Sequence, residues 1–324
     1  MNYKSFSDLS WLIKNKIPLL QSENYDLIVG IPRSGMVPAY IIALYLNKKC
    51  CDIDSLLKNS PLKTGSTRNT KSLISYPSEA KKILLVDDSI LSGKSLANEL
   101  IKIPKDMKSK ITTLAIYSSE KIRNDVDIFL EYLPLPRIFE WNIFHHNVVE
   151  RSCFDIDGVL CIDPTEDEND DGKKYVDFIL NAPPLFIPSR KINCIVTSRL
   201  EKYRDETETW LKNNGVDYNS LIMLDLPSKE ERQRLGAHAN HKAEMYKKSE
   251  LELFYESDRN QAITIHRLTN KPVFCIETNE MFTKGQIMSA IFDSYSRRLY
   301  FANALKKLPK PVYNTFRSFY HLIR

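Results

Sequence analysis

The chain has 324 residues, of which 43% are hydrophobic and 27% are charged, and its formal net charge is +5. This composition is typical of a globular protein and excludes a disordered chain, and the length predicts two domains because one core seldom organises so many residues. The net charge is too small to indicate a nucleic-acid partner. Residues 1–10 lack the apolar core of a signal peptide, and no apolar run is long enough to span a membrane, which predicts a cytoplasmic protein.

The N-terminal half alternates short apolar runs with helical patterns. Residues 26–31 and 82–86 are predicted strands, each followed by a loop and then by a helix, at residues 37–46 and 96–103. Residues 111–117 supply another strand. Such alternation predicts an α/β fold with a doubly wound parallel sheet, which binds its ligands at the carboxyl ends of the strands.

The same alternation begins again after Pro136. The predicted strands of this second half are residues 148–156, 192–196, 252–255 and 272–276, with helical stretches between them. We therefore predict two doubly wound, Rossmann-like parallel-sheet domains, the second with little or no cap. The expected ranges are 1–147 for the first domain, 148–290 for the second, and 291–324 for a basic, amphipathic helical tail.

Two adjacent acids, Asp87 and Asp88, mark the first candidate site, because they follow a predicted strand and precede a loop of small residues that opens a helix. Backbone N–H groups and hydroxyls at such a helix start can hold a phosphate. Carboxylates one sugar's length away can accept hydrogen bonds from vicinal hydroxyls. The pattern favours a ribose 5-phosphate, held by Asp87, Asp88, Ser89, Ser92, Gly93, Lys94 and Ser95.

This pattern resembles the signature of type I phosphoribosyltransferases. Residues 30–35 (GIPRSG) look like that family's pyrophosphate loop, which implies that Arg33, Ser34 and Gly35 hold the leaving group. The resemblance implies phosphoribosyl pyrophosphate (PRPP) as the donor, Mg²⁺ on the leaving group, and residues 58–72 as the loop that closes over the site. Relatives acting on 6-oxopurines carry an acid at the position of Leu91, so a purine acceptor is not expected.

The second candidate site begins with residues 154–160 (FDIDGVL), which place two carboxylates after a predicted strand. Hydrolysis of a phosphomonoester through an aspartyl phosphate needs a carboxylate nucleophile, a general acid, a divalent cation and countercharge. The run resembles the first motif of the haloacid-dehalogenase superfamily, which implies Asp155 as nucleophile and Asp157 as general acid and base.

Later residues are similar to the remaining motifs of that superfamily. Thr197 would bind the phosphoryl group, and Lys242 would supply the cation, although a solvated lysine is the alternative. The resemblance implies a Mg²⁺ site made by Asp155 and Asp157 together with Glu256 or Asp258. The insertions between the motifs are too short for a large cap, which favours a bulky substrate.

The two activities together predict net ribosylation. Fusions of this kind are similar to enzymes that install ribofuranose in bacterial surface polysaccharides. We therefore expect transfer of 5-phosphoribosyl from PRPP to a glycan or lipid-linked sugar, followed by hydrolysis of the 5-phosphate. Two alternatives stay open: a nucleobase phosphoribosyltransferase fused to a 5′-nucleotidase, and a PRPP-sensing domain that regulates a phosphatase.

The tail at residues 291–324 combines seven basic residues with a single acid, Asp293, and interleaves them with aromatic side chains. An amphipathic stretch of this kind can rest on a membrane that carries a lipid-linked acceptor, which predicts a peripheral site at the inner membrane surface. Helices docked on the second domain explain the same pattern equally well.

Overall fold

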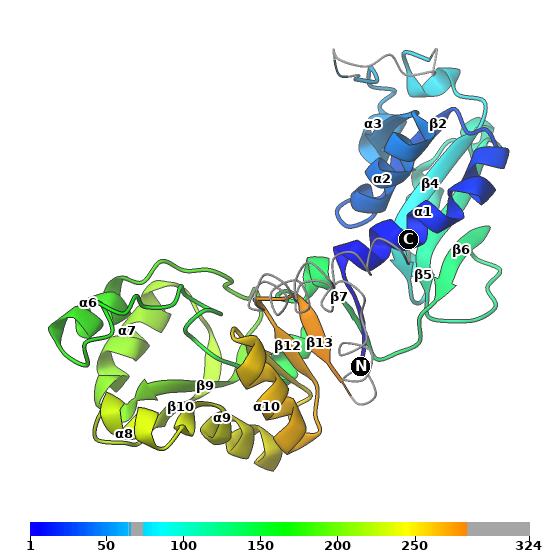
Figure 1. The fold of residues 1–324 in the computed structure, drawn as a ribbon. Coiled ribbons are helices and arrows are strands. Elements are labelled where there is room, and N and C mark those ends of the chain that lie inside the picture. Colours follow the sequence, from blue (N-terminus) through cyan, green and yellow to red (C-terminus); the bar gives the residue numbers. More distant parts are fainter. Residues whose placement is uncertain (64, 66–73, 284–324) are drawn as a thin grey trace, which may run out of the picture. The chain divides into compact units, whose positions relative to one another are not determined.

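The chain divides into two compact α/β units, Met1–Ile143 and Phe144–Arg324 (Figure 1). The computed structural model describes residues 1–63, 65 and 74–283. Each unit is built on a sheet of its own in which parallel strands dominate, so the predicted fold class is confirmed. The predicted tail and most of the predicted closing loop at residues 58–72 lie outside the described residues.

The first unit is built on a five-stranded sheet in which every neighbouring pair is parallel. Its order is β3-β2-β4-β5-β6. The strands are β2 (Leu27–Gly30), β3 (Lys49–Asp52), β4 (Ile83–Ile90), β5 (Ile111–Ser118) and β6 (Ile128–Tyr132). A separate parallel pair joins β1 (Asn2–Lys4) to β7 (Arg137–Phe139).

Helices cover both faces of this sheet. Successive side chains of a strand point to opposite faces, so each face packs against its own helices. On β4, Leu84 and Val86 belong to one core cluster, and Ile83 and Leu85 belong to another. The first cluster takes in α1 (Phe6–Ser22) and α2 (Met36–Leu46), and the second takes in α3 (Ile53–Leu57), α4 (Lys94–Lys102) and α5 (Lys105–Lys108). Ser5 and Asp8 begin α1 with reciprocal side-chain caps. The short helices η1 (Pro77–Glu79) and η2 (Glu140–Asn142) complete the unit.

The second unit is built on a six-stranded sheet of order β10-β9-β8-β11-β12-β13. Its strands are parallel except for the edge strand β13, which pairs antiparallel with β12 and was not predicted. The strands are β8 (Ser152–Phe154), β9 (Ile192–Leu200), β10 (Tyr218–Leu224), β11 (Leu253–Glu256), β12 (Val273–Cys275) and β13 (Glu280–Phe282).

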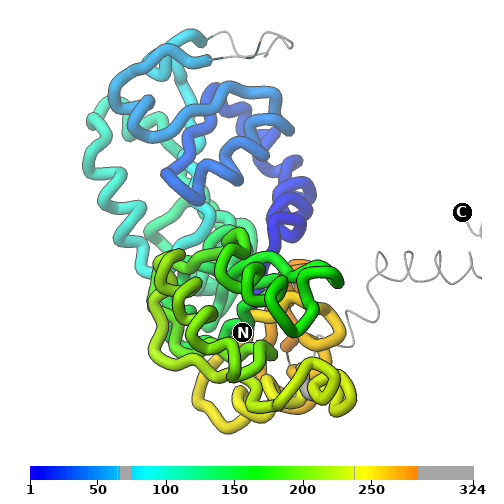
Figure 2. The backbone as a smooth tube through the Cα atoms, turned by 90° about the vertical axis from the view of Figure 1, so that its left-hand side faces the viewer, coloured from blue at the N-terminus to red at the C-terminus, as the bar shows by residue number. Residues whose placement is uncertain are grey.

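Except for η3, which precedes β8, the helices of the second unit lie between these strands in the sequence. Figure 2 traces the backbone of this unit from green to orange. The longest helix, α9, packs against β9 and α10. The helices of this unit are η3 (Asn147–Arg151), α6 (Lys173–Asn181), η4 (Glu201–Tyr203), α7 (Arg204–Asn213), α8 (Lys229–Arg234), α9 (Ala237–Lys248) and α10 (Arg259–Thr269). No helix within the described residues is long and apolar enough to cross a membrane.

Three predicted strands differ in extent from those of the structure. The strand expected at residues 148–156 is a 3₁₀-helix, η3, followed by the three residues of β8. The strands expected to end at Val86 and Val196 continue to Ile90 and Leu200. Polar side chains at their ends hid this continuation, since propensity reads such residues as loop.

Each sheet has one point at which its winding direction reverses. In the first unit, the connection from β2 leads to β3 and that from β4 leads to β5, on opposite sides. In the second unit, the chain passes from β8 to β9 but from β11 to β12 in the other direction. The loops after two neighbouring strands therefore diverge, which leaves a crevice for a ligand. The predicted site residues follow these strands.

We expect the substitution Leu84→Ala to destabilise the first unit by about 2–5 kcal/mol, because the side chain is fully buried in the core and leaves a cavity. The matched control is Leu44→Ala on α2, whose leucine is 78% exposed. Urea unfolding, monitored by hydrogen exchange of peptides from the first unit, measures the free energy of unfolding for both substitutions. Equal effects of the two substitutions would contradict this placement of the core.

Candidate functional site

The loop after β2 packs closely against the end of β4. Ile31 donates its backbone N–H to the carbonyl oxygen of Val86 at 2.9 Å. A Cβ atom on Gly35 would lie 2.6 Å from the Ile31 oxygen and 2.8 Å from the Val86 oxygen, closer than real contacts allow. The peptide bond between Pro32 and Arg33 is cis. Glycine is therefore required at position 35 for the predicted pyrophosphate loop to approach β4.

Asp88 connects this loop to the end of the first unit's sequence. Its carboxylate accepts a hydrogen bond from the Ser34 hydroxyl at 2.7 Å and another from the Trp141 indole N–H at 2.8 Å. Only 6% of Asp88 is exposed. Trp141 stacks on Phe139 with ring centroids 4.8 Å apart. Asp88 is therefore oriented by two separate segments, the loop with Ser34 and the segment with Trp141, which meet at the end of β4.

Asp87 lies on β4 next to Asp88. The prediction ended this strand at Val86 and placed both acids after it. The carboxylate of Asp87 accepts the backbone N–H of Asp88 at 2.9 Å. Burial, followed by the charge of Asp88, raises the pKa of Asp87 to about 7. This carboxyl group is thus poised to change its charge near neutral pH.

The predicted phosphate loop lies between the end of β4 and the start of α4. Gly93 begins α4 with φ +73°, a conformation that favours glycine. Ser89 is half-buried, and the remaining residues of the predicted set are exposed: Ser92, Lys94 and Ser95. Leu91 is 52% exposed. The loop therefore presents its backbone and hydroxyl groups to solvent at a helix start.

Two arginines that sequence reasoning missed hold the base of this loop. Arg123 donates from Nη1 to the carbonyl oxygen of Leu91 at 2.8 Å, and Arg137 donates from Nη2 to that of Ile90 at 3.0 Å. Arg123 also pairs with Asp125 at 2.7 Å. The two side chains therefore fix the carbonyl groups of Leu91 and Ile90, and Asp125 offsets the charge of Arg123. Their distance from the loop in sequence left no local signal.

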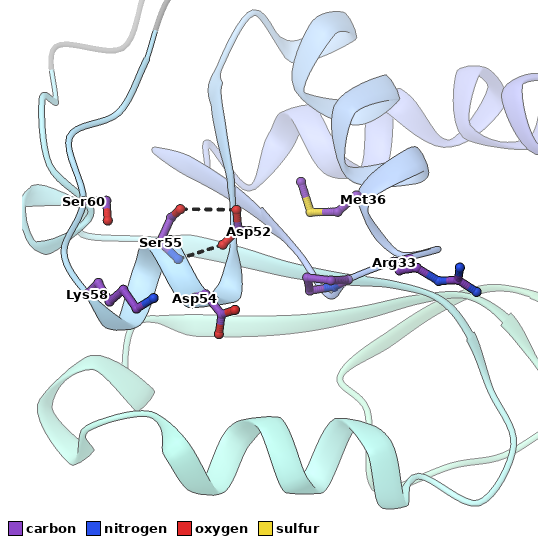
Figure 3. Close-up of a pocket in the computed structure, with 8 residues that line it drawn as sticks. Arg33, Met36, Asp52, Asp54, Ser55, Lys58 and Ser60 are labelled. Atoms are coloured by element: carbon purple, nitrogen blue, oxygen red, sulfur yellow. Dashed lines mark hydrogen bonds between the residues drawn. The ribbon is translucent and has the colours of Figure 1, made fainter.

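A cavity of about 650 Å³ adjoins the predicted pyrophosphate loop. In Figure 3, Asp52 and Ser55 are hydrogen-bonded to each other, and Arg33 lies at the other end with its guanidinium pointing away from them. Met36 lies between the two ends (Figure 3). The lining residues are Pro32, Arg33, Met36, Asp52, Asp54, Ser55, Lys58 and Ser60.

The second unit brings Asp155, Lys242 and Glu256 together. The Lys242 ammonium donates to Asp155 at 2.5 Å and to Glu256 at 2.8 Å. Lys242 is 1% exposed, so the alternative of a solvated lysine is wrong. Burial raises the pKa of Asp155 to about 7, against the attraction of Lys242. Burial opposes the charge on Lys242, but the two carboxylates raise its pKa above the ordinary value.

Asp157 is held by Arg199, which sequence reasoning also missed. The guanidinium donates from Nη2 to Asp157 Oδ1 at 2.6 Å and from Nε at 3.1 Å. Arg199 is fully buried. Thr197 is buried as well, and its hydroxyl accepts the backbone N–H of Arg199 at 3.2 Å. Arg199 stands two residues after Thr197 in the sequence, and only the extension of β9 turns it toward Asp157.

The two acids after β11 have different positions. Glu256 accepts from Lys242 through one oxygen and from the backbone N–H of Ser257 through the other, at 2.9 Å. Asp258 instead caps α10 by accepting the backbone N–H of Gln261 at 2.7 Å. Asp163, which was not predicted, lies close enough to Asp157 for its charge, after burial, to raise the Asp163 pKa.

These carboxylates are the donors that Mg²⁺ prefers. As the side chains lie, however, oxygens of Asp155 and Glu256 are engaged by Lys242, and both oxygens of Asp157 by Arg199. Within the described residues, no three His, Cys, Asp or Glu side chains form a group that could hold a metal ion. The Mg²⁺ site predicted from Asp155, Asp157 and Glu256 or Asp258 is therefore not formed as these side chains lie, and it stays a prediction.

Residues 8–145 match the family model of the phosphoribosyl transferase domain. A search of curated proteins found no match. Among solved structures, the chain is similar to a purine phosphoribosyltransferase from Pyrococcus horikoshii, with 19% identity and a TM-score of 0.32, over 43% of this chain and 92% of the other.

Two further solved structures have comparable similarity. The xanthine-guanine-hypoxanthine phosphoribosyltransferase of Helicobacter pylori is 18% identical with a TM-score of 0.33, over 44% of this chain and 93% of the other. A chain of a Pnkp1/Rnl/Hen1 complex is 16% identical with a TM-score of 0.26, over 77% of this chain and 94% of the other. Similarity at this level carries no argument about function. The family model is what identifies the N-terminal unit, which carries a phosphoribosyl transferase domain at residues 8–145.

Proposed function

We propose that this chain is a bifunctional enzyme in which the first unit transfers 5-phosphoribosyl from PRPP to a glycan acceptor and the second unit removes the 5-phosphate. The observation that carries the second activity is the buried cluster of Lys242, Asp155 and Glu256 at the winding reversal of a second sheet. Asp155 of this cluster belongs to the FDIDGVL run at residues 154–160. The first unit of the same chain carries a phosphoribosyl transferase domain.

In the transfer step, an acceptor hydroxyl oxygen forms a bond to the anomeric carbon of the ribose while the bond to pyrophosphate breaks, and the hydroxyl proton passes to the departing pyrophosphate. Asp87 and Asp88 would accept hydrogen bonds from the ribose hydroxyls, and the loop of residues 89–95 would hold the 5-phosphate. Pyrophosphate would leave against Arg33, Ser34 and Gly35, beside the cavity. Phosphoribosyltransferases typically use Mg²⁺ together with PRPP, and Asp52 and Asp54 offer carboxylates in that cavity.

In the phosphatase step, a carboxylate oxygen of Asp155 attacks phosphorus and the bond to the ribose 5-oxygen breaks. Asp157 donates a proton to that oxygen and then takes one from the water that hydrolyses the aspartyl phosphate. Thr197 would bind the phosphoryl oxygens. Lys242 offsets the charge of Asp155 and Glu256, and Arg199 fixes the direction of Asp157.

Coupling the reactions in one chain keeps the phosphorylated intermediate at a high local concentration. The product of both steps is a ribofuranosyl glycan. Our expectation that residues 291–324 bring the enzyme to a membrane-linked acceptor in the cytoplasm, at the inner membrane surface, is part of this proposal. Position 91 is a leucine and not an acid. The inference that the acceptor is not a purine is part of this proposal as well.

We expect the substitution Asp155→Asn to lower phosphatase activity by more than roughly a hundredfold, because an amide oxygen is a poor nucleophile. Transfer should continue, so the variant should accumulate a glycan that keeps its phosphate. Mass spectrometry of products from PRPP and a panel of lipid-linked sugars and free bases checks this. The control is Asp167→Asn, whose side chain is 81% exposed.

The same experiment separates the alternatives. Accumulation of a nucleotide by Asp155→Asn would favour nucleobase salvage over the glycan acceptor. Absence of any transfer product in both proteins would favour a PRPP sensor. Unchanged phosphatase activity in Asp155→Asn would contradict the proposed nucleophile.

We also predict that the affinity for PRPP rises with pH through Asp87. With a pKa of about 7, Asp87 is mostly protonated at pH 6 and mostly ionised at pH 8, and the ionised group is the stronger acceptor for hydroxyl hydrogen bonds. The substitution Asp87→Asn should weaken PRPP binding about tenfold at pH 8 and hardly at all near pH 5.5. Calorimetric titration across this range measures the difference.

The matched control is Asp106→Asn on the exposed helix α5. Its binding curve should follow that of the unsubstituted enzyme at every pH. An equal loss of affinity at low and high pH in Asp87→Asn would show that ionisation of Asp87 has no part in PRPP binding.

A further inference from the structure

Two buried arginines of the second unit have nitrogen atoms without a hydrogen-bond partner. Arg199 on β9 is fully buried, and its Nη1 makes no hydrogen bond. Arg232 on α8 is 6% exposed, and its Nε makes none. Buried donors of this kind are costly unless a ligand satisfies them.

These two guanidinium groups lie close to the same phenol. Tyr175 on α6 is 3% exposed. Burial and then the charge of Asp157 raise its pKa, while the charges of both arginines and a hydrogen bond with Arg232 oppose that rise. Arg232 also donates from Nη1 to the carbonyl oxygen of Ser198 at 2.8 Å, next to Thr197 and Arg199 in β9. Arg232 therefore reaches the carboxyl end of β9, where the predicted phosphoryl-binding threonine lies.

The charges around Arg232 are not balanced by the protein. Arg199 is paired with Asp157, whereas Arg232 forms no ion pair with any Asp or Glu in the described part of the chain. Lys242 is paired with Asp155 and Glu256 and does not share them with Arg232. A buried, unpaired guanidinium of this kind favours an anionic ligand, which it can bind with two parallel hydrogen bonds.

We propose that Arg232, together with Arg199 Nη1 and Tyr175, forms a subsite for a second phosphate group on the phosphatase substrate. The phosphoryl group that is cleaved must lie within bonding distance of Asp155, where Lys242 supplies the countercharge. Arg232 contacts none of these carboxylates and lies instead beside Tyr175, so it serves a different part of the substrate. This inference rests on the proposed phosphatase function and narrows its substrate to one that carries a further phosphate group besides the 5-phosphate that is cleaved.

The test compares each of two bisphosphates with its monophosphate, using the full chain. The probes are ribose 1,5-bisphosphate against ribose 5-phosphate, and fructose 1,6-bisphosphate against fructose 6-phosphate. The unsubstituted enzyme should have a higher kcat/KM for at least one bisphosphate. The substitution Arg232→Gln should reduce that preference roughly 10- to 100-fold, by lowering kcat/KM for the bisphosphate much more than for the monophosphate, since one charge-assisted interaction is lost.

Arg234→Gln is the matched control, because Arg234 is on the same helix, has a 69% exposed side chain and pairs with Glu231. It should retain the full preference, and Arg232→Lys should retain part of it. Thermal unfolding shows whether each variant folds, and the preference of the unsubstituted enzyme stands as a test in itself.

Two outcomes would overturn the subsite. One is equal kcat/KM for bisphosphate and monophosphate in both pairs. The other is an equal loss for both kinds of substrate in Arg232→Gln, which would place Arg232 on the cleaved phosphoryl group. Hydrolysis of p-nitrophenyl phosphate distinguishes failure of the subsite from failure of the proposed function, because absence of that hydrolysis would remove the phosphatase as well.

Discussion

The buried ion cluster of Lys242, Asp155 and Glu256 is the interaction on which the account of the second unit depends. Three ionised groups that are nearly or fully buried are stable only when each has a partner, since an isolated buried charge costs several kcal/mol. The cluster joins the ends of β8 and β11 to the middle of α9. Because those strands flank the winding reversal of the sheet, the cluster lies where loops diverge and a substrate can enter.

The two units share this construction but use it with different side chains. In the first unit, Asp87 and Asp88 lie at the end of β4, next to the loop that follows β2, and hydroxyl, indole and backbone groups satisfy them. Such partners leave a carboxylate able to exchange one hydrogen bond for another with a sugar. In the second unit the partners are cations, which is the arrangement expected where negative charge collects on a phosphoryl group.

Much of the architecture could be predicted from the sequence, because the alternation of apolar strands with helices is a local signal. The motif residues Asp155 and Lys242 are 87 positions apart, yet the order of the motifs they resemble was enough to predict that they act in one site. The choice between Glu256 and Asp258 was left open, although it depends on which acid caps α10. Asp258 followed three residues later by Gln261 is a helix-start signal, and it points to Asp258 as the cap.

The arginines were the principal omission. Each of the four arginines binds a group that is more than 30 residues away in the sequence. They are Arg123, Arg137, Arg199 and Arg232. An arginine in a printed sequence is most often solvated, so residue type gave no reason to select these four. Likewise, the ends of β4 and β9 were missed because pairing with neighbouring strands overrides the preference of polar residues for loops.

The most direct measurement follows the two parts of the phosphoribosyl group separately. PRPP carrying radioactive carbon in its ribose and radioactive phosphorus in its 5-phosphate would be incubated with the enzyme and a lipid-linked sugar. The account predicts that the sugar gains the carbon label alone and that the phosphorus label appears as inorganic phosphate. A sugar product that keeps both labels, or no labelled sugar with any acceptor, would contradict it.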